Sequence, residues 1–349
     1  MPWRKDLMIP SSGGILIVDK EVGMTSAAVV SRARRLLGER RVGHTGTLDP
    51  FASGVLPVCF GRATAASHYM LHWNKRYLCG ISLGMSTDTM DCTGEEALRT
   101  PEADWRRFAV LPDDAVVREL SAAAKSLVGE REQQVPVYSA VKVNGKRLYR
   151  YAREGCEVAC PKRDITVYDA VYRGLFTDEA TGFPVVMVEF LVSSGTYVRV
   201  LAEDFGRAIG CYAHARSLRR LAAGHLSVDQ SVTVDDLFGI FRSLGRDTAH
   251  FLRRITEKGI VLPLSSVFGG WPRVFFDDKG ASDLVHGRKV PVVEGRSAPP
   301  ADSLAERNAG AEPGMFAFFS GSRLIAVGRA EEGYYCVKRV FTAPEDAVK

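Results

Sequence analysis

The sequence predicts an α+β protein: a mixed or largely antiparallel sheet with helices, followed by a small β-barrel. Between about residues 14 and 268, strand-like and helix-like segments interleave, yet many strand-like segments follow one another directly. A doubly wound parallel sheet would place a helix between successive strands, so this order favours a mixed or antiparallel sheet. From about Trp271 the chain changes to short strand-like runs separated by glycines, which is typical of a small barrel.

The first elements are predicted to be a strand, a helix and a loop. Residues 14–20 form a β-branched apolar run after Gly-Gly, the pattern of a strand. Thr25 or Ser26 can cap the helix that follows, whose apolar residues recur at helical spacing, and Gly38 ends it. Because Gly and Pro punctuate residues 43–54, this segment is predicted to be a loop.

The middle of the chain predicts one long helix and a central strand. Acidic residues begin the segment 102–128 and Lys125 lies near its end, which suits a helix dipole. Residues 184–192 are apolar on both faces and are therefore predicted to be a central strand, and 193–210 turns at a glycine into a helix. Residues 131–155 mix Pro, Asn-Gly, tyrosines and positive charge, which indicates an exposed basic loop or hairpin. Further strands are predicted over 55–60, 76–84 and 165–174.

Composition narrows the class of protein. A length of 349 residues favours two domains, and 46% hydrophobic with 25% charged residues is typical of a soluble globular protein. No apolar run is long enough to cross a bilayer and the start lacks a secretory signal, so we expect a cytoplasmic protein with no membrane partner. The seven cysteines include no C-x-x-C pair, and no nucleotide-binding glycine motif is present. The sequence therefore predicts neither a metal nor a cofactor.

Positive charge is clustered rather than strong overall. The net charge is +5, but residues 32–41 carry five arginines against one glutamate, and 142–153 carry no acidic residue. A third cluster is Arg216, Arg219 and Arg220. Separate basic stripes can converge on a phosphate backbone. For any single stripe, a solvated surface is the more common explanation.

The loop sequence GHTGTLDP carries the first candidate catalytic residue. Asp49 precedes Pro50, which favours an extended backbone at the aspartate. A lone carboxylate here, beside His44 and Thr47, can serve as a nucleophile or general base. The alternative is an Asx-type turn in which Asp49 bonds its own backbone, and the local sequence alone favours that alternative.

The segment SSGTYVR holds the second candidate pair. An arginine at position 199, facing a buried aspartate, would keep that aspartate ionised against the desolvation that protonates it. An aromatic ring at Tyr197 can stack on a base. Taken alone, a surface Arg199 and a half-buried Tyr197 are again the more common arrangement.

Five segments, taken in order, resemble bacterial tRNA pseudouridine-55 synthases of the TruB family. The resemblance covers roughly residues 13–240, and the segment that holds Asp49 is the most specific. The five segments span residues 43–64, 75–95, 134–155, 193–206 and 211–224.

The resemblance implies a pseudouridine synthase fold with a cleft for RNA. It implies a catalytic domain over 11–268, an RNA-gripping thumb over 131–155 and a PUA-like RNA-binding domain over 271–345. The implied substrate is the T-stem-loop of tRNA, in which one flipped-out uridine, position 55, is isomerised to pseudouridine. No cofactor, no metal and no obligate protein partner is implied, and we expect a monomer.

The resemblance also implies roles for individual residues. Asp49 is the implied nucleophile and Arg199 its partner. Tyr77 would stack on the target base and is a candidate for removing a proton. Tyr197 would line the uracil pocket, and His44 would hold the flipped-out conformation by stacking.

Further residues are implied to bind the RNA. Leu218 would close the pocket, and Asp91 matches a position that contacts the RNA region. Two departures affect the grip: Ala65 stands where relatives usually carry lysine, and Val135 where they carry proline. The residues expected at the RNA backbone are Arg62, Lys142, Lys146, Arg147, Arg219 and Arg220.

Two other functions remain open at this stage. The same fold could serve a non-catalytic tRNA-binding or RNA-chaperone protein. An aspartate-based glycosidase ranks low, because it normally needs two carboxylates flanking the scissile bond and this loop offers Asp49 alone.

Overall fold

The computed structural model describes residues 13–109, 113–298 and 314–342. Within this part of the chain, the main sheet has eleven strands in the order β14-β1-β3-β12-β4-β11-β10-β7, with β13, β15 and β2 paired beside this path. Most pairings are antiparallel, and β1–β14 and β3–β12 are parallel. The prediction of a mixed, mostly antiparallel sheet is confirmed.

The strands of the main sheet have these bounds: β1 Gly13–Lys20, β2 Val42–His44, β3 Ser53–Gly61, β4 Lys75–Leu83, β7 Gly129–Gln134, β10 Lys162–Thr177, β11 Pro184–Val192, β12 Ala213–Ala223, β13 Leu226–Ser227, β14 Val232–Thr233 and β15 Val261–Leu262. As predicted, β11 is internal: it lies between β4 and β10. A separate two-stranded sheet pairs β5 (Met85–Thr87) with β6 (Glu96–Arg99).

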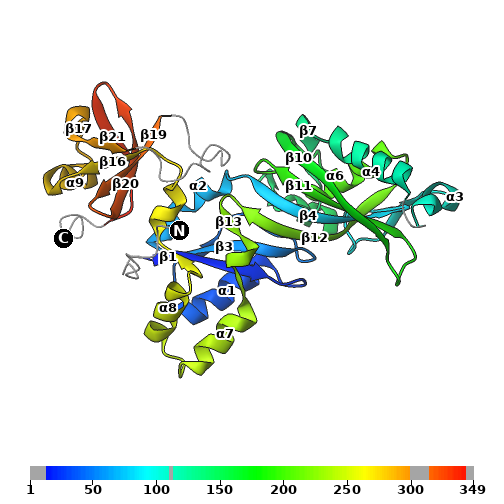
Figure 1. Ribbon diagram of the computed structural model, residues 1–349, viewed down its shortest axis with the longest axis horizontal. Helices are drawn as coiled ribbons and strands as arrows, with labels where there is room; N and C mark the ends of the chain where they lie inside the picture. Colours follow the sequence, from blue (N-terminus) through cyan, green and yellow to red (C-terminus); the bar gives the residue numbers. More distant parts are fainter. Residues whose placement is uncertain (1–12, 110–112, 299–313, 343–349) are drawn as a thin grey trace.

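Helices cover the sheet in two groups (Figure 1). One group, α4 (Asp114–Ser126) and α6 (Val198–Ala208), packs beside β10, β11 and β12, and the other lies under β1 and β3. The second group is α1 (Ser26–Leu37), α7 (Val234–Ser243) and α8 (Thr248–Glu257).

The structure shows which residues cap the two ends of α1. Thr25, not Ser26, accepts the capping hydrogen bond, from the backbone N–H of Ala28 at 3.1 Å. Gly38 ends the helix in the left-handed region with φ 61°, where glycine has no steric penalty. The hydroxyl of Ser26 is thereby available to the loop that carries Asp49.

The single helix predicted over 102–128 is wrong. The structure has a short helix α3 (Glu102–Trp105), a 3-10 turn, and a separate helix α4 that begins after Asp113. Asp113 accepts a hydrogen bond from the backbone N–H of Val116 at 2.8 Å, so it caps a new helix. The acidic residues that suggested one dipole belong to the starts of two helices.

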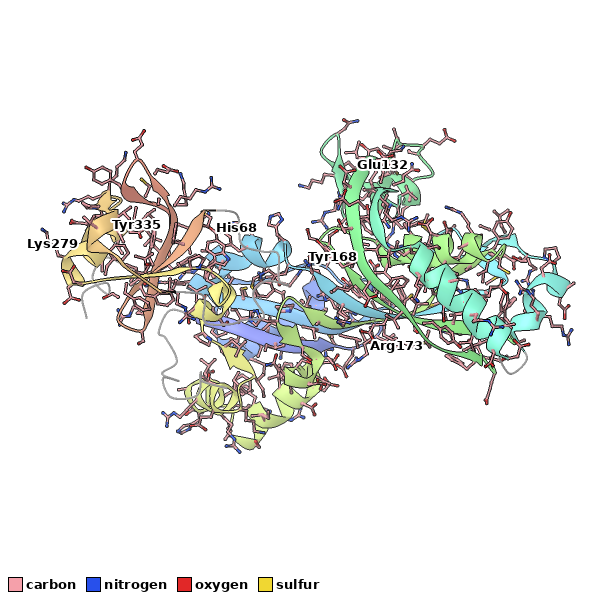
Figure 2. All side chains as sticks on the ribbon, turned by 45° about the horizontal axis from the view of Figure 1, so that its top comes forward. His68, Glu132, Tyr168, Arg173, Lys279 and Tyr335 are labelled. Atoms are coloured by element: carbon pink, nitrogen blue, oxygen red, sulfur yellow. The ribbon has the colours of Figure 1, made fainter. Side chains whose placement is uncertain are left out.

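The predicted basic hairpin forms the tip of the segment 131–155. Its root is the edge strand β7, and its tip pairs β8 (Lys142–Val143) with β9 (Lys146–Arg147). Asn144 and Gly145 connect these strands with φ of 52° and 79°, the left-handed pair that a two-residue hairpin turn requires. Helix α5 (Leu148–Arg153) follows. Figure 2 shows Glu132, at the root, rising from the upper side of the molecule.

The C-terminal region forms a second, six-stranded sheet in the order β17-β21-β20-β19-β16-β18, which fits the predicted PUA-like domain. Trp271 and Phe341 pack in one apolar cluster with Ile15 and Ile17 of β1, so the two sheets share a core. The elements are β16 Arg273–Phe276, α9 Asp278–Val285, β17 Val290–Pro291, β18 Arg296–Ala298, β19 Met315–Ser320, β20 Arg323–Glu331 and β21 Tyr334–Val340. Of the expected domain ranges, residues 11–12, 110–112, 299–313 and 343–345 lie outside the described residues.

Candidate active site

Asp49 lies in the loop between β2 and β3, and the first turn of α1 holds this loop. Ser26 and Leu48 exchange two hydrogen bonds: the Leu48 N–H donates to Oγ of Ser26 at 3.0 Å, and that hydroxyl donates to the Leu48 carbonyl at 3.1 Å. Ser26 is buried, so water does not compete for these bonds. The backbone one residue before Asp49 is therefore fixed.

Two buried cations hold the rest of the loop. The Lys20 ammonium donates to the carbonyls of Met24 at 2.6 Å and Pro50 at 3.4 Å. Burial lowers the pKa of Lys20 to about 8, and the nearby charge of Asp49 opposes this shift. Arg220 donates to the carbonyls of Val55 at 2.6 Å and of Gly46 at 3.3 Å. Both cations act on backbone carbonyls that face the protein interior.

The carboxylate of Asp49 pairs with the buried guanidinium of Arg199. Nε of Arg199 lies 3.0 Å from Oδ2 of Asp49, and the Asp49 side chain is 36% exposed whereas that of Arg199 is 3% exposed. The N–H of Nε is not aligned for a hydrogen bond in this contact. Asp49 thus has an anchored partner on its inner side and an outer side that solvent or a substrate can reach.

Arg199 is itself held at three further points. Nη1 donates to the carbonyl of Thr89 at 2.7 Å and lies 3.4 Å from Oδ2 of Asp91, and Nη2 donates to the carbonyl of Tyr138 at 2.9 Å. These partners come from two loops far apart in the sequence. A guanidinium can serve all of them because its donors form a planar fork.

Asp91 is a buried partner of Arg199. Its Oδ1 accepts hydrogen bonds from the hydroxyls of Thr89 at 3.0 Å and Thr93 at 2.6 Å, and from the Thr93 N–H at 2.9 Å. Only 5% of Asp91 is exposed. The RNA contact predicted for Asp91 does not fit this geometry, because the carboxylate is already bonded within the protein and has almost no accessible surface.

Opposing influences set the ionisation of Asp49. Desolvation by its surroundings raises the pKa of Asp49 above its ordinary value, and the charge of Arg199 lowers it. Asp91 raises the pKa as well, because two carboxylates near one guanidinium repel each other. Although part of the side chain is accessible, protein surrounds the carboxyl on most sides, and the resulting desolvation keeps the pKa of Asp49 raised.

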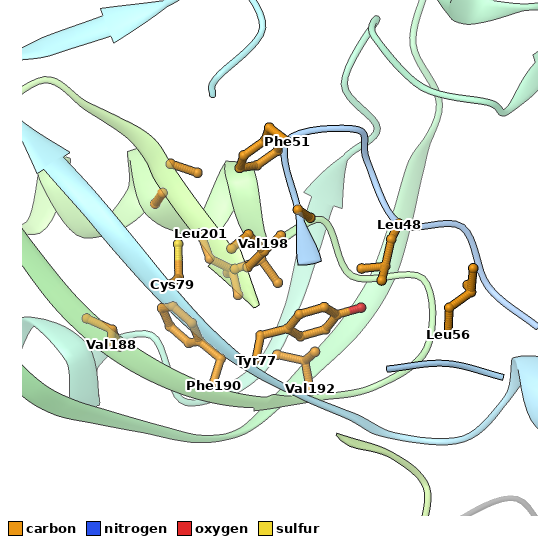
Figure 3. Close-up of a cluster of buried hydrophobic side chains, with 14 of the residues drawn as sticks. Leu48, Phe51, Leu56, Tyr77, Cys79, Val188, Phe190, Val192, Val198 and Leu201 are labelled. Atoms are coloured by element: carbon orange, nitrogen blue, oxygen red, sulfur yellow. The ribbon is translucent and has the colours of Figure 1, made fainter. Parts of the chain in front are cut away.

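The ring of Tyr77 lies beneath the Asp49 loop. Figure 3 shows Tyr77 among buried side chains that include Val192 and Val198, with its hydroxyl turned toward Leu48. Tyr77 is 8% exposed and pairs in register with Phe190 of β11. Leu218, on β12, is also buried in this cluster. Tyr77 and Leu218 therefore lie on the neighbouring strands β4 and β12, at the edge of the core.

A glutamine from the thumb root positions the backbone of Tyr197. Gln133 accepts from the Tyr197 N–H at 2.8 Å and donates from Nε2 to the Tyr197 carbonyl at 3.1 Å. Gln133 is only 3% exposed. The guanidinium of Arg163 lies over the Tyr197 ring, 5.6 Å from its centroid. Since Tyr197 immediately precedes α6, Gln133 links the thumb to the helix that carries Arg199.

His44 is placed to remain neutral. Burial lowers the pKa of His44 below its usual value, and the charge of Arg220 lowers it further. Its Nδ1 is buried without a hydrogen-bond partner among the described residues. A neutral imidazole at the start of the Asp49 loop is compatible with the predicted stacking on a base.

The residues predicted at the RNA backbone fall into two groups. Lys142 and Arg147 are exposed and face each other across the β8–β9 hairpin, and Lys146 pairs with Glu154 while lying over the ring of Tyr151. Arg62 is half-buried in the 3-10 helix Arg62–Ala66. The hairpin thus presents positive charge to solvent, as an RNA-gripping segment requires.

Arg220 does not fit the predicted contact with the RNA backbone, and Arg219 already has a partner within the protein. Arg220 is 1% exposed and its guanidinium supports the Asp49 loop, so it cannot also reach a phosphate. Arg219 forms a two-point ion pair with Asp19, at 3.1 and 2.7 Å, and donates to Ser53 at 3.3 Å. Its side chain is 40% exposed, so a phosphate contact would compete with Asp19.

Three supporting residues had no clear signal in the sequence. Lys20 is the last residue of β1, and Ser26 is the first residue of α1. Gln133 is one of several polar residues in the strand β7. Their roles depend on contacts with distant segments, at separations of 22 to 64 residues along the chain. Such contacts become visible only in the folded molecule.

The described residues contain no group of three or more side chains arranged to hold a metal ion. Likewise, none of the helices in the described ranges has the length and apolar character needed to span a membrane.

Two family models match consecutive parts of the chain. A family described as TruB family pseudouridylate synthase (N terminal domain) matches residues 34–198, and the tRNA pseudouridylate synthase B C-terminal domain matches residues 199–264. The first match contains Asp49, Tyr77 and Tyr197, and the second begins at Arg199. The ion pair between Asp49 and Arg199 thus joins the two matched regions.

Curated relatives share most of the chain. The tRNA pseudouridine synthase B of Burkholderia mallei (strain NCTC 10247) is 37% identical over 328 residues, which cover 94% of this chain and 96% of that protein. The protein of the same name from Ralstonia pickettii (strain 12J) is 37% identical over 291 residues, covering 83% of this chain and 82% of that protein.

Among solved structures, a chain of a Cbf5-Nop10-Gar1 complex is similar, with a TM-score of 0.66 and 24% identity. The match covers 97% of this chain and 88% of that chain. At this identity the likeness shows a shared fold. The curated relatives and the matched domains establish that this chain belongs to the TruB family of pseudouridylate synthases and is an isomerase.

Proposed function

We propose that the protein isomerises a uridine in the T loop of tRNA, at position 55, to pseudouridine, with Asp49 as the nucleophile on a flipped-out base. The observation that carries this proposal is the ion pair between Asp49 and Arg199, in which the arginine is buried and the carboxylate remains accessible. The relatives named tRNA pseudouridine synthase B support tRNA as the substrate.

The reaction needs no net change in oxidation state. The bond from the sugar to N1 of uracil breaks, the ring turns, and a bond from the sugar to C5 forms while C5 loses a proton and N1 gains one. Asp49 can capture the sugar or add to the base, and it leaves unchanged at the end of the cycle. Arg199 keeps the carboxylate charged in surroundings that favour its protonation.

The surrounding residues would receive the base. Tyr77 stacks on the uracil and Tyr197 lines its pocket, Leu218 closes the pocket, and His44 stabilises the flipped-out conformation by stacking. Unstacking a base costs a few kcal/mol, which these aromatic contacts offset.

The rest of the molecule would hold the RNA. The hairpin residues Lys142, Lys146 and Arg147 grip the phosphate backbone within the thumb, 131–155, and Arg62 contributes from the 3-10 helix that follows β3. We propose a catalytic domain over 11–268 and a PUA-like RNA-binding domain over 271–345. The protein acts as a monomer in the cytoplasm on tRNA, without an obligate protein partner.

The direct test is tritium release from T-arm RNA that carries uracil labelled at C5. Purified protein without added metal or nucleotide should release one tritium for each pseudouridine formed, because C5 loses its hydrogen when the new bond forms. Retention of the label, with RNA binding intact, would contradict the proposed reaction.

The raised pKa of Asp49 predicts an acid limb in the rate. Activity should rise with pH through the pKa of Asp49, at a pH above the ordinary aspartate value of about 3.9, because only the carboxylate is nucleophilic. Single-turnover rates with saturating RNA measure this limb. Circular dichroism over the same range must show a folded protein, and a rate that stays constant down to about pH 4 would contradict the assignment.

Replacing Gln133 by leucine should slow catalysis more than it weakens binding. The substitution leaves the Tyr197 N–H and carbonyl without their partners and lets Tyr197 and Arg199 shift. A shift of about 1 Å at a catalytic group can cost up to about a hundredfold in rate, so we expect kcat to fall about tenfold or more with KM nearly unchanged.

The matched control is Glu132→Gln, since Glu132 is the exposed neighbour on β7 and pairs only at the surface with Lys162. Gln133→Glu keeps the acceptor for the Tyr197 N–H and loses the donor to the Tyr197 carbonyl. Its kcat should therefore lie between those of Gln133→Leu and Glu132→Gln. If Gln133→Leu changed KM alone, Gln133 would belong to RNA binding instead.

A further inference from the structure

One residue at the base of the thumb, Tyr138, is bonded at both of its ends. Its backbone carbonyl accepts a hydrogen bond from Nη2 of Arg199 at 2.9 Å. Its hydroxyl donates to Oδ2 of Asp88 at 3.1 Å, and Asp88 immediately follows β5. Tyr138 therefore joins the arginine that pairs with Asp49 to the connection between β5 and β6.

The carboxylate of Asp88 is held in place without the tyrosine. Its Oδ1 accepts a hydrogen bond from the backbone N–H of Glu95 at 2.8 Å, and the Asp88 N–H donates to the Glu95 carbonyl at 3.1 Å. A Cβ built on Gly94 would lie only 2.3 Å from Oδ1 of Asp88, so glycine is needed for this close approach. The turn thus fixes one carboxylate oxygen, and Oδ2 serves Tyr138.

The hydroxyl of Tyr138 remains a donor to this carboxylate. Burial raises the pKa of Tyr138 above its ordinary value, and the hydrogen bond to Asp88 raises it further. Hydrogen bonds to an ionised acceptor are about twice as strong as those between neutral groups. The contact is therefore stronger than the partly exposed position of the two side chains would suggest.

The hydrogen bonds of Tyr138 belong to a closed ring. Thr89, the residue after Asp88, accepts from Nη1 of Arg199 through its carbonyl at 2.7 Å. The guanidinium, Tyr138 and the segment Asp88–Thr89 are thus connected by three hydrogen bonds. Because each bond in such a ring restricts the geometry of the other two, loss of one loosens the guanidinium.

The thumb is attached to the same point of the chain. The carbonyl of Ser139 accepts from the N–H of Tyr149 at 3.1 Å, and the carbonyl of Val141 accepts from the N–H of Leu148 at 2.8 Å. These bonds close the chain on either side of the β8–β9 hairpin, directly after Tyr138. A displacement of the hairpin is therefore carried to Tyr138.

We propose that Asp88 and Tyr138 are positioning residues that couple the thumb to catalysis, because the hydrogen bond between them keeps the Tyr138 carbonyl, and through it Arg199, in place beside Asp49. The inference rests on the proposed function and deepens it. Neither residue is required to touch the base. Both act through the guanidinium, whose exact position decides how well the carboxylate is placed for attack.

The test uses variants that change only this contact. Tyr138→Phe removes the hydroxyl, Asp88→Ala removes the acceptor, and Asp88→Asn restores an oxygen acceptor without the charge. The matched control is Glu95→Gln, because the Glu95 side chain is exposed and only its backbone bonds Asp88. Single-turnover tritium release from T-arm RNA is measured across pH, anisotropy measures RNA binding, and thermal unfolding checks that each variant is folded.

We expect Tyr138→Phe and Asp88→Ala each to lower the rate at saturating RNA about fivefold, the effect of losing one hydrogen bond, with unchanged RNA affinity. The acid limb should move to higher pH, because a less firmly held Arg199 lowers the pKa of Asp49 less. The double variant should lose no more than either single variant, since both remove the same bond. Asp88→Asn should recover most of the rate, and Glu95→Gln should match wild type.

Several results would overturn the proposal. A loss confined to RNA affinity would place Tyr138 in the RNA contact surface instead. Additive losses in the double variant, or a lower rate with an unmoved acid limb, would show that the two residues do not act together through Arg199. If wild type and all variants released tritium equally, the coupling would be refuted while the proposed reaction stood. If wild type released none, the proposed function itself would fail, and this inference with it.

Discussion

Asp49→Asn should abolish pseudouridine formation while tRNA binding persists. An amide has the shape of the carboxylate but is not a nucleophile, so we expect the rate to fall by on the order of 10³-fold or more. Binding should survive because the aspartate contributes a negative charge, not a phosphate contact, to the site. Single-turnover tritium release and anisotropy with the same RNA measure the two properties separately.

The matched control is Asp169→Asn, an exposed aspartate on β10, which should behave as wild type. The pair of variants also separates an enzyme from a non-catalytic tRNA-binding or RNA-chaperone protein on the same fold. Only an enzyme loses a chemical step when Asp49 is neutralised. Normal turnover by Asp49→Asn would mean that another group performs the reaction.

Arg199→Gln should remove activity and also destabilise the fold. The guanidinium pairs with Asp49 and Asp91 and donates to the carbonyls of Thr89 and Tyr138. Without it, the nearly buried carboxylate of Asp91 has no countercharge, and breaking a buried pair on one side typically costs about 3–5 kcal/mol. The pKa of Asp49 should rise further, because the charge of Arg199 no longer lowers it.

A second substitution separates the loss of activity from the loss of stability. In Arg199→Gln/Asp91→Asn the unpaired charge at position 91 is gone, so much of the stability should return while activity remains absent. Arg199→Lys keeps the charge but cannot direct donors to four partners, and should retain little activity. Arg207→Gln, at an exposed site on the same helix, should change the free energy of unfolding by less than about 0.5 kcal/mol. Chemical denaturation measures each value.

Equal stability of Arg199→Gln and wild type would show that this arginine is not the countercharge of Asp91. Full activity in Arg199→Lys would show that charge alone, rather than the planar fork, is sufficient beside Asp49. Either result would require a different account of how the aspartate remains ionised.

Much of the local structure could be predicted from the sequence. The β-branched run of β1, the glycine that ends α1 and the Asn-Gly turn of the thumb each depend on the preferences of a few neighbouring residues. The prediction of one helix over 102–128 was wrong because it, too, relied on local preferences alone. Charge along a segment does not reveal that Asp113 caps a new helix.

The candidate site was predictable only in part. Asp49, Tyr197 and Arg199 stand in segments with an unusual local composition, and the resemblance of those segments singled them out. The prediction for Arg220 failed because a basic cluster does not indicate which side chain faces inward. In the sheet, Arg220 pairs in register with Gly54, and a Cβ on that glycine would lie 2.2 Å from the Arg220 carbonyl oxygen.

By itself, the sequence determined the α+β class, the C-terminal β-rich unit, the Asp49 loop and the basic hairpin, since all of these depend on short-range preferences. Only the tertiary structure decided that Arg199 reaches Asp49, that Gln133 holds Tyr197, and that Arg220 supports the loop from inside. These contacts join segments that are tens to more than a hundred residues apart. Strand order and register bring them together, and no local pattern of side chains specifies either.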